Sequence, residues 1–246
     1  MQYFRAIFSG LFLFFTSLGG VRAETAIVAV AANFLTTAEI VGEAFTRDTG
    51  HEIQLVSGST GKLYAQIVNG APFDVFLAAD AARPAALEKD GLVARRMPYA
   101  FGQLVLLVRG RREASLEAIS DDRLRIAIAD PDLAPYGLAA RQVLGKLRGS
   151  ANWNGNLVYG EDIGQTMSFI ASRNADAALV ALSQMPLVNF RSQELLIPAD
   201  LYEPIRQEAV LLERATSNAA ARGFFEYLDG PVARGLIKAS GYGILE

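Results

Sequence analysis

Short apolar runs of the kind found in buried strands alternate with helical patterns in the first part of this chain. The runs cover residues 27–32, 53–56 and 73–78, and each is followed by a polar turn and then a helical pattern. Such alternation with short connections favours a mostly parallel β-sheet covered by helices on both faces. In open sheets of this kind, ligands sit at the carboxyl ends of the strands and face the N-termini of helices. The polar turns are therefore the first place to look for a binding site.

A second set of strands and helices follows the first without a Pro-rich or low-complexity linker. Further strands are predicted at 104–108, 125–130, 156–159, 177–181, 194–197 and 208–212, and further helices at 138–147, 163–173, 218–228 and 232–239. The α/β pattern without a linker predicts two lobes joined by crossing strands, for which 104–108 and 208–212 are the candidates. We expect lobe 1 to comprise residues 24–102 plus 209–246, and lobe 2 residues 103–208. Each lobe should hold a mixed, mostly parallel sheet flanked by helices, with the C-terminal helices packed on lobe 1.

The N-terminal residues have the pattern of a secretory signal peptide. Arg5 gives a modest basic region, residues 7–18 are apolar, and Val-Arg-Ala at 21–23 puts small residues where a signal peptidase reads. We expect cleavage after Ala23. The alternative is an uncleaved anchor helix, but the apolar run is short for a membrane span. No later apolar stretch is long enough to cross a bilayer, so no membrane insertion is expected after cleavage.

Composition excludes several classes of function. Cleavage removes Arg5 and Arg22 but no acidic residue, so the formal net charge moves from −3 to −5. A mildly acidic protein lacks the basic surface that nucleic acids require. The absence of cysteine excludes disulfides, thiolate metal sites and a cysteine nucleophile. A single histidine, His51, argues against a zinc site and against a Ser–His–Asp triad. We interpret His51 as a solvent-facing loop residue.

Residues 57–66, Ser-Gly-Ser-Thr-Gly-Lys-Leu-Tyr-Ala-Gln, are the strongest candidate for a ligand site. They join a strand to a helix through small hydroxyl and glycine residues. The backbone N–H groups in the first turn of a helix lack intrahelical partners, and the helix dipole favours negative charge there. Comparable junctions occur at Asn33, at Tyr136 with Gly137, and at Ile163. We expect several of these termini to meet around one oxyanion.

Two catalytic interpretations of this stretch are weak. An ATPase phosphate loop, G-x-x-x-x-G-K-[ST], would need glycine at Val56 and a hydroxyl residue at Leu63. A secreted hydrolase with Ser59 as nucleophile is a remote alternative, because His51 is the only histidine and Lys62 should point along a helix. Acidic residues near strand ends match no calcium loop, so a metal held by the protein's own side chains is not indicated.

A series of short motifs runs along the mature chain in a fixed order. They are Val-Ala-Ala-Asn-Phe at 30–34, Ser-Gly-Ser-Thr-Gly-Lys at 57–62, Gly-Ala-Pro-Phe-Asp at 70–74, Ala-Ala-Asp at 78–80, Asp-Pro at 130–131, Pro-Tyr-Gly at 135–137, Gly-Glu-Asp-Ile at 160–163, Phe-Glu-Tyr-Leu-Asp-Gly-Pro at 225–231 and Gly-Tyr at 241–242. Together they resemble the periplasmic molybdate-binding proteins, the substrate-binding subunits of molybdate ABC transporters. The resemblance covers essentially the whole mature chain. It implies a type II periplasmic binding protein fold, in which two α/β lobes close on a tetrahedral oxyanion, and a protein that is not an enzyme.

The resemblance also implies which residues hold the oxyanion. Ligands in this family are neutral hydroxyls and backbone N–H groups rather than arginine or lysine, and molybdenum is held only as the bound oxyanion. The implied contacts are Asn33, Phe34, Ser59, Thr60, Tyr136 and Ile163, the last two mostly through backbone N–H. Some relatives place a tyrosine hydroxyl where this chain has Ala181. That contact is missing here unless Asn33 or Tyr136 replaces it, and Ser183 is a weaker candidate for the same role.

The resemblance therefore predicts a monomeric periplasmic protein, without a cofactor, that delivers molybdate or tungstate to an inner-membrane ABC permease with its ATPase. A cage of neutral donors suits a fully deprotonated dianion, which only accepts hydrogen bonds. Sulfate would be rejected by cavity size, and phosphate because its proton finds no acceptor. A same-fold binding protein for another anion, such as sulfate or a small organic acid, is the alternative. An organic acid would favour an arginine clamp, which the matched motifs lack.

Overall fold

The computed structural model describes residues 23–110, 112–148 and 156–244. Within these residues the strands form two five-stranded sheets. The first sheet contains β1 (Thr25–Ala31), β2 (Glu52–Gly58), β3 (Val75–Ala78), β4 (Val93–Gly102) and β10 (Ile205–Leu212), in the order β2-β1-β3-β10-β4. The second contains β5 (Leu104–Arg109), β6 (Ile126–Ala129), β7 (Leu157–Gly160), β8 (Ala177–Ala181) and β9 (Ser192–Leu196), in the order β7-β6-β8-β5-β9. Almost all of the predicted signal peptide lies outside the described residues.

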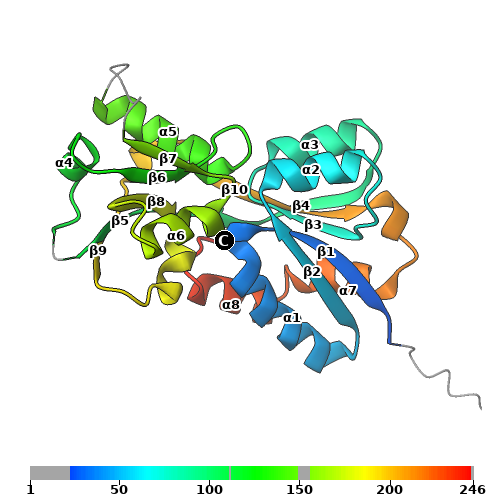
Figure 1. The fold of residues 1–246 in the computed structure, drawn as a ribbon. Helices are drawn as coiled ribbons and strands as arrows, with labels where there is room; N and C mark the ends of the chain where they lie inside the picture. The colour runs from blue at the N-terminus through cyan, green and yellow to red at the C-terminus, as the bar shows by residue number, and fades with distance from the viewer. Residues whose placement is uncertain (1–22, 111, 149–155, 245–246) are drawn as a thin grey trace, which may run out of the picture.

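Helices flank each sheet, and the two sheets with their helices lie side by side as a first and a second lobe (Figure 1). The helices of the first lobe are α1 (Leu35–Thr49), α2 (Thr60–Val68), α3 (Ala82–Lys89), α7 (Ala219–Tyr227) and α8 (Pro231–Ala239). Those of the second are α4 (Leu116–Ile119), α5 (Pro135–Arg148) and α6 (Ile163–Ala171). Short 3₁₀ turns are η1 (Ala32–Phe34), η2 (Leu182–Leu187), η3 (Ala199–Leu201) and η4 (Glu213–Ala215).

Both sheets are mixed, as the sequence predicted. β1 pairs in parallel with β2 and β3, whereas β10 runs antiparallel to β3 and β4. In the second sheet β6 pairs in parallel with β7 and β8, and β5 is antiparallel to β8 and β9. β5 and β10, the strands with antiparallel neighbours on both sides, each follow a passage of the chain from one lobe to the other.

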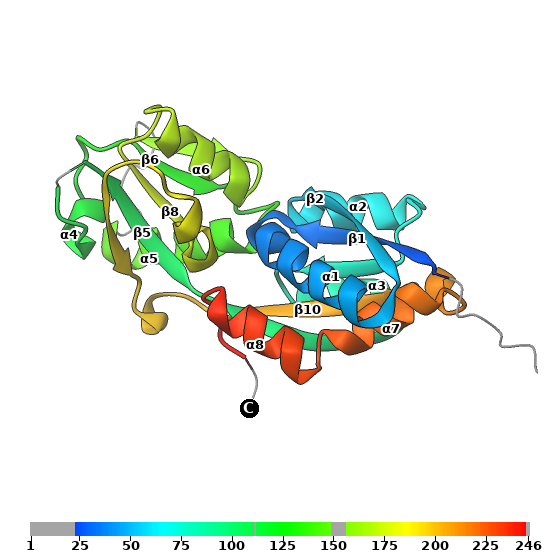
Figure 2. The same ribbon diagram turned by 90° about the horizontal axis from the view of Figure 1, so that it is seen from below.

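The first sheet is buried on both faces, and its inner strand β1 is apolar on both. Val28 and Val30 of β1 join a cluster with residues of α1, α7 and α8, whereas Ala29 joins a cluster with residues of α2 and α3. Successive side chains of a strand point to opposite faces, so the continuous apolar run at 27–32 supplies both clusters. The C-terminal helices pack on this lobe, and Figure 2 shows α7 and α8 beneath it.

The strand β4 was not predicted from the sequence. It contains Arg95, Arg96 and Pro98, which obscure the apolar pattern. β4 is an edge strand, and its pairing with β10 shifts register between Gln207 and Glu208, beside Pro98. Proline and charged residues are tolerated on edge strands because one side needs no ladder hydrogen bonds. The position of the strand, rather than its composition, explains why it forms.

The chain passes between the lobes at two places. Gln103 alone separates β4 from β5, and residues 197–204, which include η3, separate β9 from β10. The predicted crossing strands, 104–108 and 208–212, are thus parts of β5 and β10, which follow the crossings. At one crossing the N–H of Leu104 donates to the Tyr202 hydroxyl at 3.2 Å.

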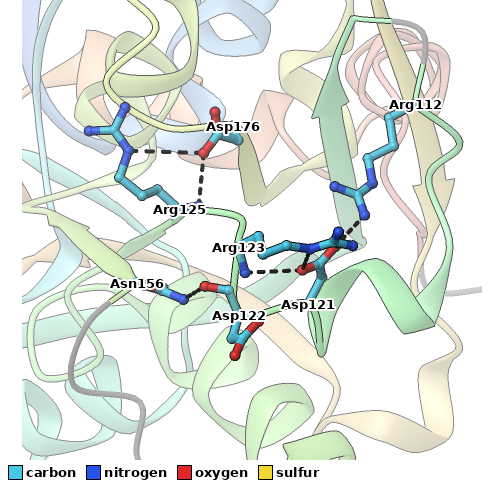
Figure 3. Close-up of polar contacts among 7 residues, drawn as sticks. All are labelled: Arg112, Asp121, Asp122, Arg123, Arg125, Asn156 and Asp176. Atoms are coloured by element: carbon cyan, nitrogen blue, oxygen red, sulfur yellow. Dashed lines mark hydrogen bonds and ion pairs between the residues drawn. The ribbon is translucent and has the colours of Figure 1, made fainter.

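Charged residues form a contact cluster at the amino end of β6 (Figure 3). The candidate ligand site predicted from the sequence lies at the other end of the strands, their carboxyl ends. Asp121 pairs with Arg112 and Arg123, and these hydrogen bonds hold the pKa of Asp121 well below its usual range, the Arg123 side chain having the largest effect. Asp176 accepts from the N–H of Arg125 at 2.9 Å. These contacts tie together loops of the second lobe.

Candidate functional site

The N-terminus of α2 presents two hydroxyl groups with their protons available. Ser59 caps the helix, and its Oγ accepts from the N–H of Lys62 at 3.3 Å. Thr60 Oγ1 accepts from the N–H of Ala79 at 3.2 Å. Both side chains are buried. A hydroxyl that accepts from a backbone N–H keeps its own proton for another acceptor, so the two side chains can both donate to a ligand.

A second donor terminus in the first lobe is η1, which continues directly into α1. Asn33 and Phe34 are in this 3₁₀ turn and are buried. The N–H of Phe34 makes the first i+3→i hydrogen bond of the turn, to its cap residue Ala31, whereas the N–H of Asn33 comes before that bond and lacks an intrahelical acceptor. The side-chain amide of Asn33 already makes two hydrogen bonds within the protein, since Nδ2 donates to Gln207 Oε1 at 3.0 Å and to the Tyr242 hydroxyl at 3.1 Å. Both amide protons are used in these bonds. Asn33 therefore offers its backbone N–H.

The second lobe contributes the N-termini of α5 and α6. Proline at the first position of α5 is followed by Tyr136, whose N–H precedes the first helical hydrogen bonds. The N–H of Gly137, which the sequence suggested as a further donor, instead donates to Ala134 O at 2.9 Å. In α6 the Asp162 side chain caps the helix by accepting from Gln165 N–H at 3.0 Å, so the earlier N–H of Ile163 is left uncapped.

These termini come together where the two lobes meet. Gly61 N–H, in α2, donates to Leu133 O just before α5, at 2.9 Å. The Lys62 ammonium pairs with Glu161, just before α6, at 2.5 Å. Helix α6 also contacts η1. A Cβ on Gly61 would lie 3.0 Å from Leu133 O, so glycine permits this close approach. Donor termini from both lobes therefore surround the interface between α2 and the two second-lobe helices.

The side chain of Tyr136 reaches away from its helix toward the strand crossing. Its hydroxyl accepts from Gln207 Nε2 at 3.4 Å, and a Cβ on Gly102 would lie 2.2 Å from the hydroxyl oxygen. Glycine at the end of β4 is thus required by the ring of Tyr136. Ala181, where some relatives carry a tyrosine, ends β8 and pairs with Leu104.

Ser183 lies in η2, just after β8 ends at Ala181, and it bridges the two lobes. Its hydroxyl donates to the carbonyl oxygen of Asn33 at 3.0 Å, and it lies 2.9 Å from the Tyr242 hydroxyl. Neither the Asn33 amide nor the Ser183 hydroxyl therefore has a proton left over in this arrangement. The hydroxyls of Ser59 and Thr60 only accept in the contacts described above, so their protons remain available for a ligand.

Three buried tyrosines surround this interface and stay neutral. Burial raises the pKa of Tyr99, Tyr136 and Tyr242 well above the ordinary value for a phenol. Tyr99 donates to Gln207 Oε1 at 3.0 Å. Their hydroxyls therefore remain hydrogen-bond donors near neutral pH, and no phenolate charge opposes an anion.

The cationic side chains beside the site, Lys62 and Arg83, form ion pairs with carboxylates. Lys62 pairs with Glu161, and Arg83 pairs with Asp80 while also donating to Asp132 O at 2.7 Å. Among the residues that the structure describes, no group of three or more His, Cys, Asp or Glu side chains is placed to hold a metal ion. No helix in the described ranges is long and apolar enough to span a membrane. The chemistry available is hydrogen-bond donation by neutral groups.

Neither His51 nor Lys62 is placed to act as a general base for Ser59. His51 lies at the far end of α1, where its Nδ1 accepts from the N–H of Glu24 at 3.2 Å and its ring stacks on Phe45. The Lys62 ammonium is held by Glu161. A nucleophilic serine needs a base within hydrogen-bond reach, and neither residue meets that requirement.

Sequence reasoning missed the polar partners that hold the site in place. Gln184, Gln207, Tyr99 and Tyr242 were not singled out as site residues, and only Tyr242 fell in a quoted motif. They meet Asn33 and its neighbours across long separations, such as 174 residues between Asn33 and Gln207. Local patterns identify helix termini but not such distant partners.

Comparisons with known proteins agree with this architecture. The family model described as bacterial extracellular solute-binding protein matches residues 26–243. The molybdate-binding protein ModA of Azotobacter vinelandii is 42% identical over 234 residues, covering 91% of both chains, and that of Rhodobacter capsulatus is 39% identical over 224 residues, covering 89% of this chain and 88% of that one. The solved periplasmic molybdate-binding protein of Azotobacter vinelandii superposes with a TM-score of 0.84 at 37% identity, covering 90% of this chain and all of that one. The chain therefore belongs to the bacterial extracellular solute-binding proteins, and within them to the molybdate-binding protein family.

Proposed function

We propose that this protein binds molybdate, and tungstate with it, between its two lobes. The observation that carries the proposal is the meeting of helix termini from both lobes, with two oriented hydroxyl donors beside which the cations Lys62 and Arg83 are paired with carboxylates. The relatives named molybdate-binding protein, at 42% and 39% identity over about nine-tenths of the chain, support this choice of oxyanion.

The proposed contacts come from neutral groups. In the first lobe they are the backbone N–H of Asn33, the hydroxyl of Ser59, and the hydroxyl and N–H of Thr60. In the second lobe they are the N–H groups of Tyr136 and Ile163. Molybdate accepts at every oxygen, and each charge-assisted bond contributes roughly 1.5–3 kcal/mol. A few such bonds offset the loss of water from the dianion.

This donor set also gives a rule for selectivity. Phosphate near neutral pH often carries a proton, which needs an acceptor, whereas the proposed contacts only donate. Sulfate matches the acceptor pattern of molybdate but is smaller, so it would leave longer and weaker hydrogen bonds. Selection would thus combine a missing acceptor against phosphate with a size mismatch against sulfate.

The division of the chain follows from this role. We propose that lobe 1, residues 24–102 plus 209–246, and lobe 2, residues 103–208, separate to admit the oxyanion and close to hold it. β10 begins at Ile205 and pairs with β4 of the first sheet from there on, so the second crossing lies within residues 197–204, a few residues before that boundary. We further propose a cleaved signal peptide ending at Ala23, a monomer in the periplasm, and delivery of the oxyanion to an inner-membrane ABC permease.

A thermal-shift panel with molybdate, tungstate, sulfate and phosphate tests the proposal. A ligand that binds only the native state adds about 2.7 kcal/mol to the free energy of unfolding at 100 times its Kd, and it therefore raises the melting temperature. Molybdate and tungstate should raise it at micromolar concentration, and phosphate should not at a thousandfold excess. No shift with either molybdate or tungstate would refute the assignment.

A further inference from the structure

One turn of the second lobe docks on the first lobe through two successive carbonyl oxygens. The turn, residues 130–134, connects β6 to α5. Leu133 O accepts from the N–H of Gly61 at 2.9 Å, and Asp132 O accepts from Arg83 Nη2 at 2.7 Å. Gly61 lies in α2 and Arg83 in α3. The 130–134 turn is therefore held by two helices of the other lobe.

The 130–134 turn is also fixed to the start of α5. Within the turn, the N–H of Ala134 donates to Asp130 O at 2.8 Å. The carbonyl oxygen of Ala134 accepts in turn from the N–H groups of Gly137 and Leu138, at 2.9 and 3.1 Å, in the first turn of α5. A shift of the 130–134 turn would thus carry the N-terminus of α5 with it. The docked position of the turn sets the distance between the N-termini of α5 and α2.

Gly61 is the residue that allows the turn to dock so closely. It is the second residue of α2, where an N–H has no acceptor within the helix, and it donates instead across the interface to Leu133 O. Its φ is not positive, so the backbone conformation does not require glycine. A Cβ at this position would lie 3.0 Å from Leu133 O, 3.2 Å from Leu133 Cα and 3.1 Å from Arg83 Nη2. The contact between the lobes, rather than the helix, accounts for glycine here.

We infer that Gly61 is a positioning residue for the oxyanion, because it lets the 130–134 turn dock closely enough for donors at the N-termini of α2 and α5 to reach one ligand. This inference rests on the proposed function and identifies what sets the distance between the closed lobes. Thr60 directly precedes Gly61, and Tyr136 follows the turn by two residues. A Cβ at position 61 would hold the turn away by a few tenths of an ångström and lengthen the hydrogen bonds to the ligand.

Gly61→Ala tests the inference, since it adds one Cβ and changes no charge. Titration with sodium molybdate should give an affinity roughly fivefold to tenfold weaker than that of the unmodified protein, because the hydrogen bond to Leu133 O is lengthened or lost. Stopped-flow measurement should place the loss in the dissociation rate, because association begins from separated lobes. The melting temperature of the ligand-free variant should rise, since alanine is more stable than glycine in a helix.

Gly235→Ala is the matched control. Gly235 is an exposed residue of α8 in the same lobe, with open space around its Cβ position. Alanine there should raise the ligand-free melting temperature in the same way, and it should leave the molybdate affinity and dissociation rate unchanged. The pair of variants separates an effect on docking from an effect on helix stability.

Amide hydrogen exchange measures docking in the unmodified protein. With ¹⁵N-glycine labelling, sodium molybdate should slow exchange of the Gly61 amide roughly tenfold or more, because that N–H meets Leu133 O only when the lobes meet. The amide of Gly235, inside α8, should change much less. This readout needs no substitution and does not depend on the stability of a variant.

The outcomes distinguish this inference from the proposed function. Suppose that the unmodified protein binds molybdate. An unchanged affinity of Gly61→Ala, an equal loss of affinity in Gly235→Ala, or unchanged exchange of the Gly61 amide would then each overturn the positioning role alone. An unmodified protein that binds neither molybdate nor tungstate would overturn the proposed function.

Discussion

The Ser59 and Thr60 hydroxyls are set in place by the backbone before any ligand arrives. Each accepts a hydrogen bond from a main-chain N–H, which fixes the oxygen and leaves the proton to point outward. A donor that is already oriented loses little conformational entropy on binding. Neutral, pre-oriented donors can therefore hold a dianion without a charged side chain.

Thr60→Ala should weaken molybdate binding roughly 10- to 100-fold, because it removes one charge-assisted hydrogen bond. Lys62→Ala should weaken it less than about fivefold, because the Lys62–Glu161 pair is solvent-exposed and such pairs contribute little. Calorimetric titration measures both. Thr60→Ser keeps the hydroxyl and should restore most of the affinity. A larger effect of Lys62→Ala than of Thr60→Ala would indicate recognition by charge.

Gly102→Ala should destabilise the protein by about 1–3 kcal/mol, because the added Cβ would overlap the Tyr136 hydroxyl and force a shift. Gly145→Ala is the control. Gly145 is in α5 with open space around its Cβ position, so alanine there should stabilise by about 0.5–1 kcal/mol. Urea unfolding measures both changes. Equal stability of the two variants would contradict the close contact between Gly102 and Tyr136.

At the scale of elements, the helix N-termini carry the site, and their local caps follow from the sequence. Ser59 and Asp162 cap α2 and α6, and each is a small polar residue that directly precedes a helical pattern, as N-cap residues commonly do. The strand β4 was not recognisable, because its edge position compensates for Arg95, Arg96 and Pro98. The partners of Asn33 could not be predicted either, since they depend on how distant elements pack. Local sequence specifies termini, and tertiary packing decides what they face.

The ion pair between α2 and the turn before α6 should tune closure rather than recognition. Lys62→Glu places two acids together and should raise the molybdate dissociation rate a fewfold, with the effect reduced at high salt. The exchanged pair, Lys62→Glu with Glu161→Lys, should recover most of the original rate. Stopped-flow displacement at two ionic strengths measures these rates. Failure of the exchanged pair to recover would show that Lys62 acts on the ligand itself.

For the whole molecule, the buried tyrosines make alkaline pH a probe of the lobe interface. In the unfolded chain their phenols ionise near pH 10, whereas burial raises the pKa values of Tyr99, Tyr136 and Tyr242 in the folded protein. Their contribution to stability is therefore fully present below about pH 10 and is lost as the pH rises further.

Urea unfolding between pH 8 and pH 11 tests this sign. The free energy of unfolding should fall above about pH 10, and Tyr242→Phe should make that fall shallower. Tyr159→Phe, at a site 52% exposed, should leave the slope unchanged. An identical slope for Tyr242→Phe and the unmodified protein would contradict the burial of an ionisable phenol at position 242.

The central claim is that two lobes close a cage of neutral donors around a fully deprotonated tetrahedral oxyanion. Competition calorimetry tests it most directly, with molybdate titrated into protein that already contains an excess of phosphate or sulfate. We predict one molybdate site per chain, with an affinity that excess phosphate leaves unchanged and excess sulfate lowers only slightly. Phosphate that displaces molybdate at comparable concentration, or the absence of any molybdate heat, would contradict the account.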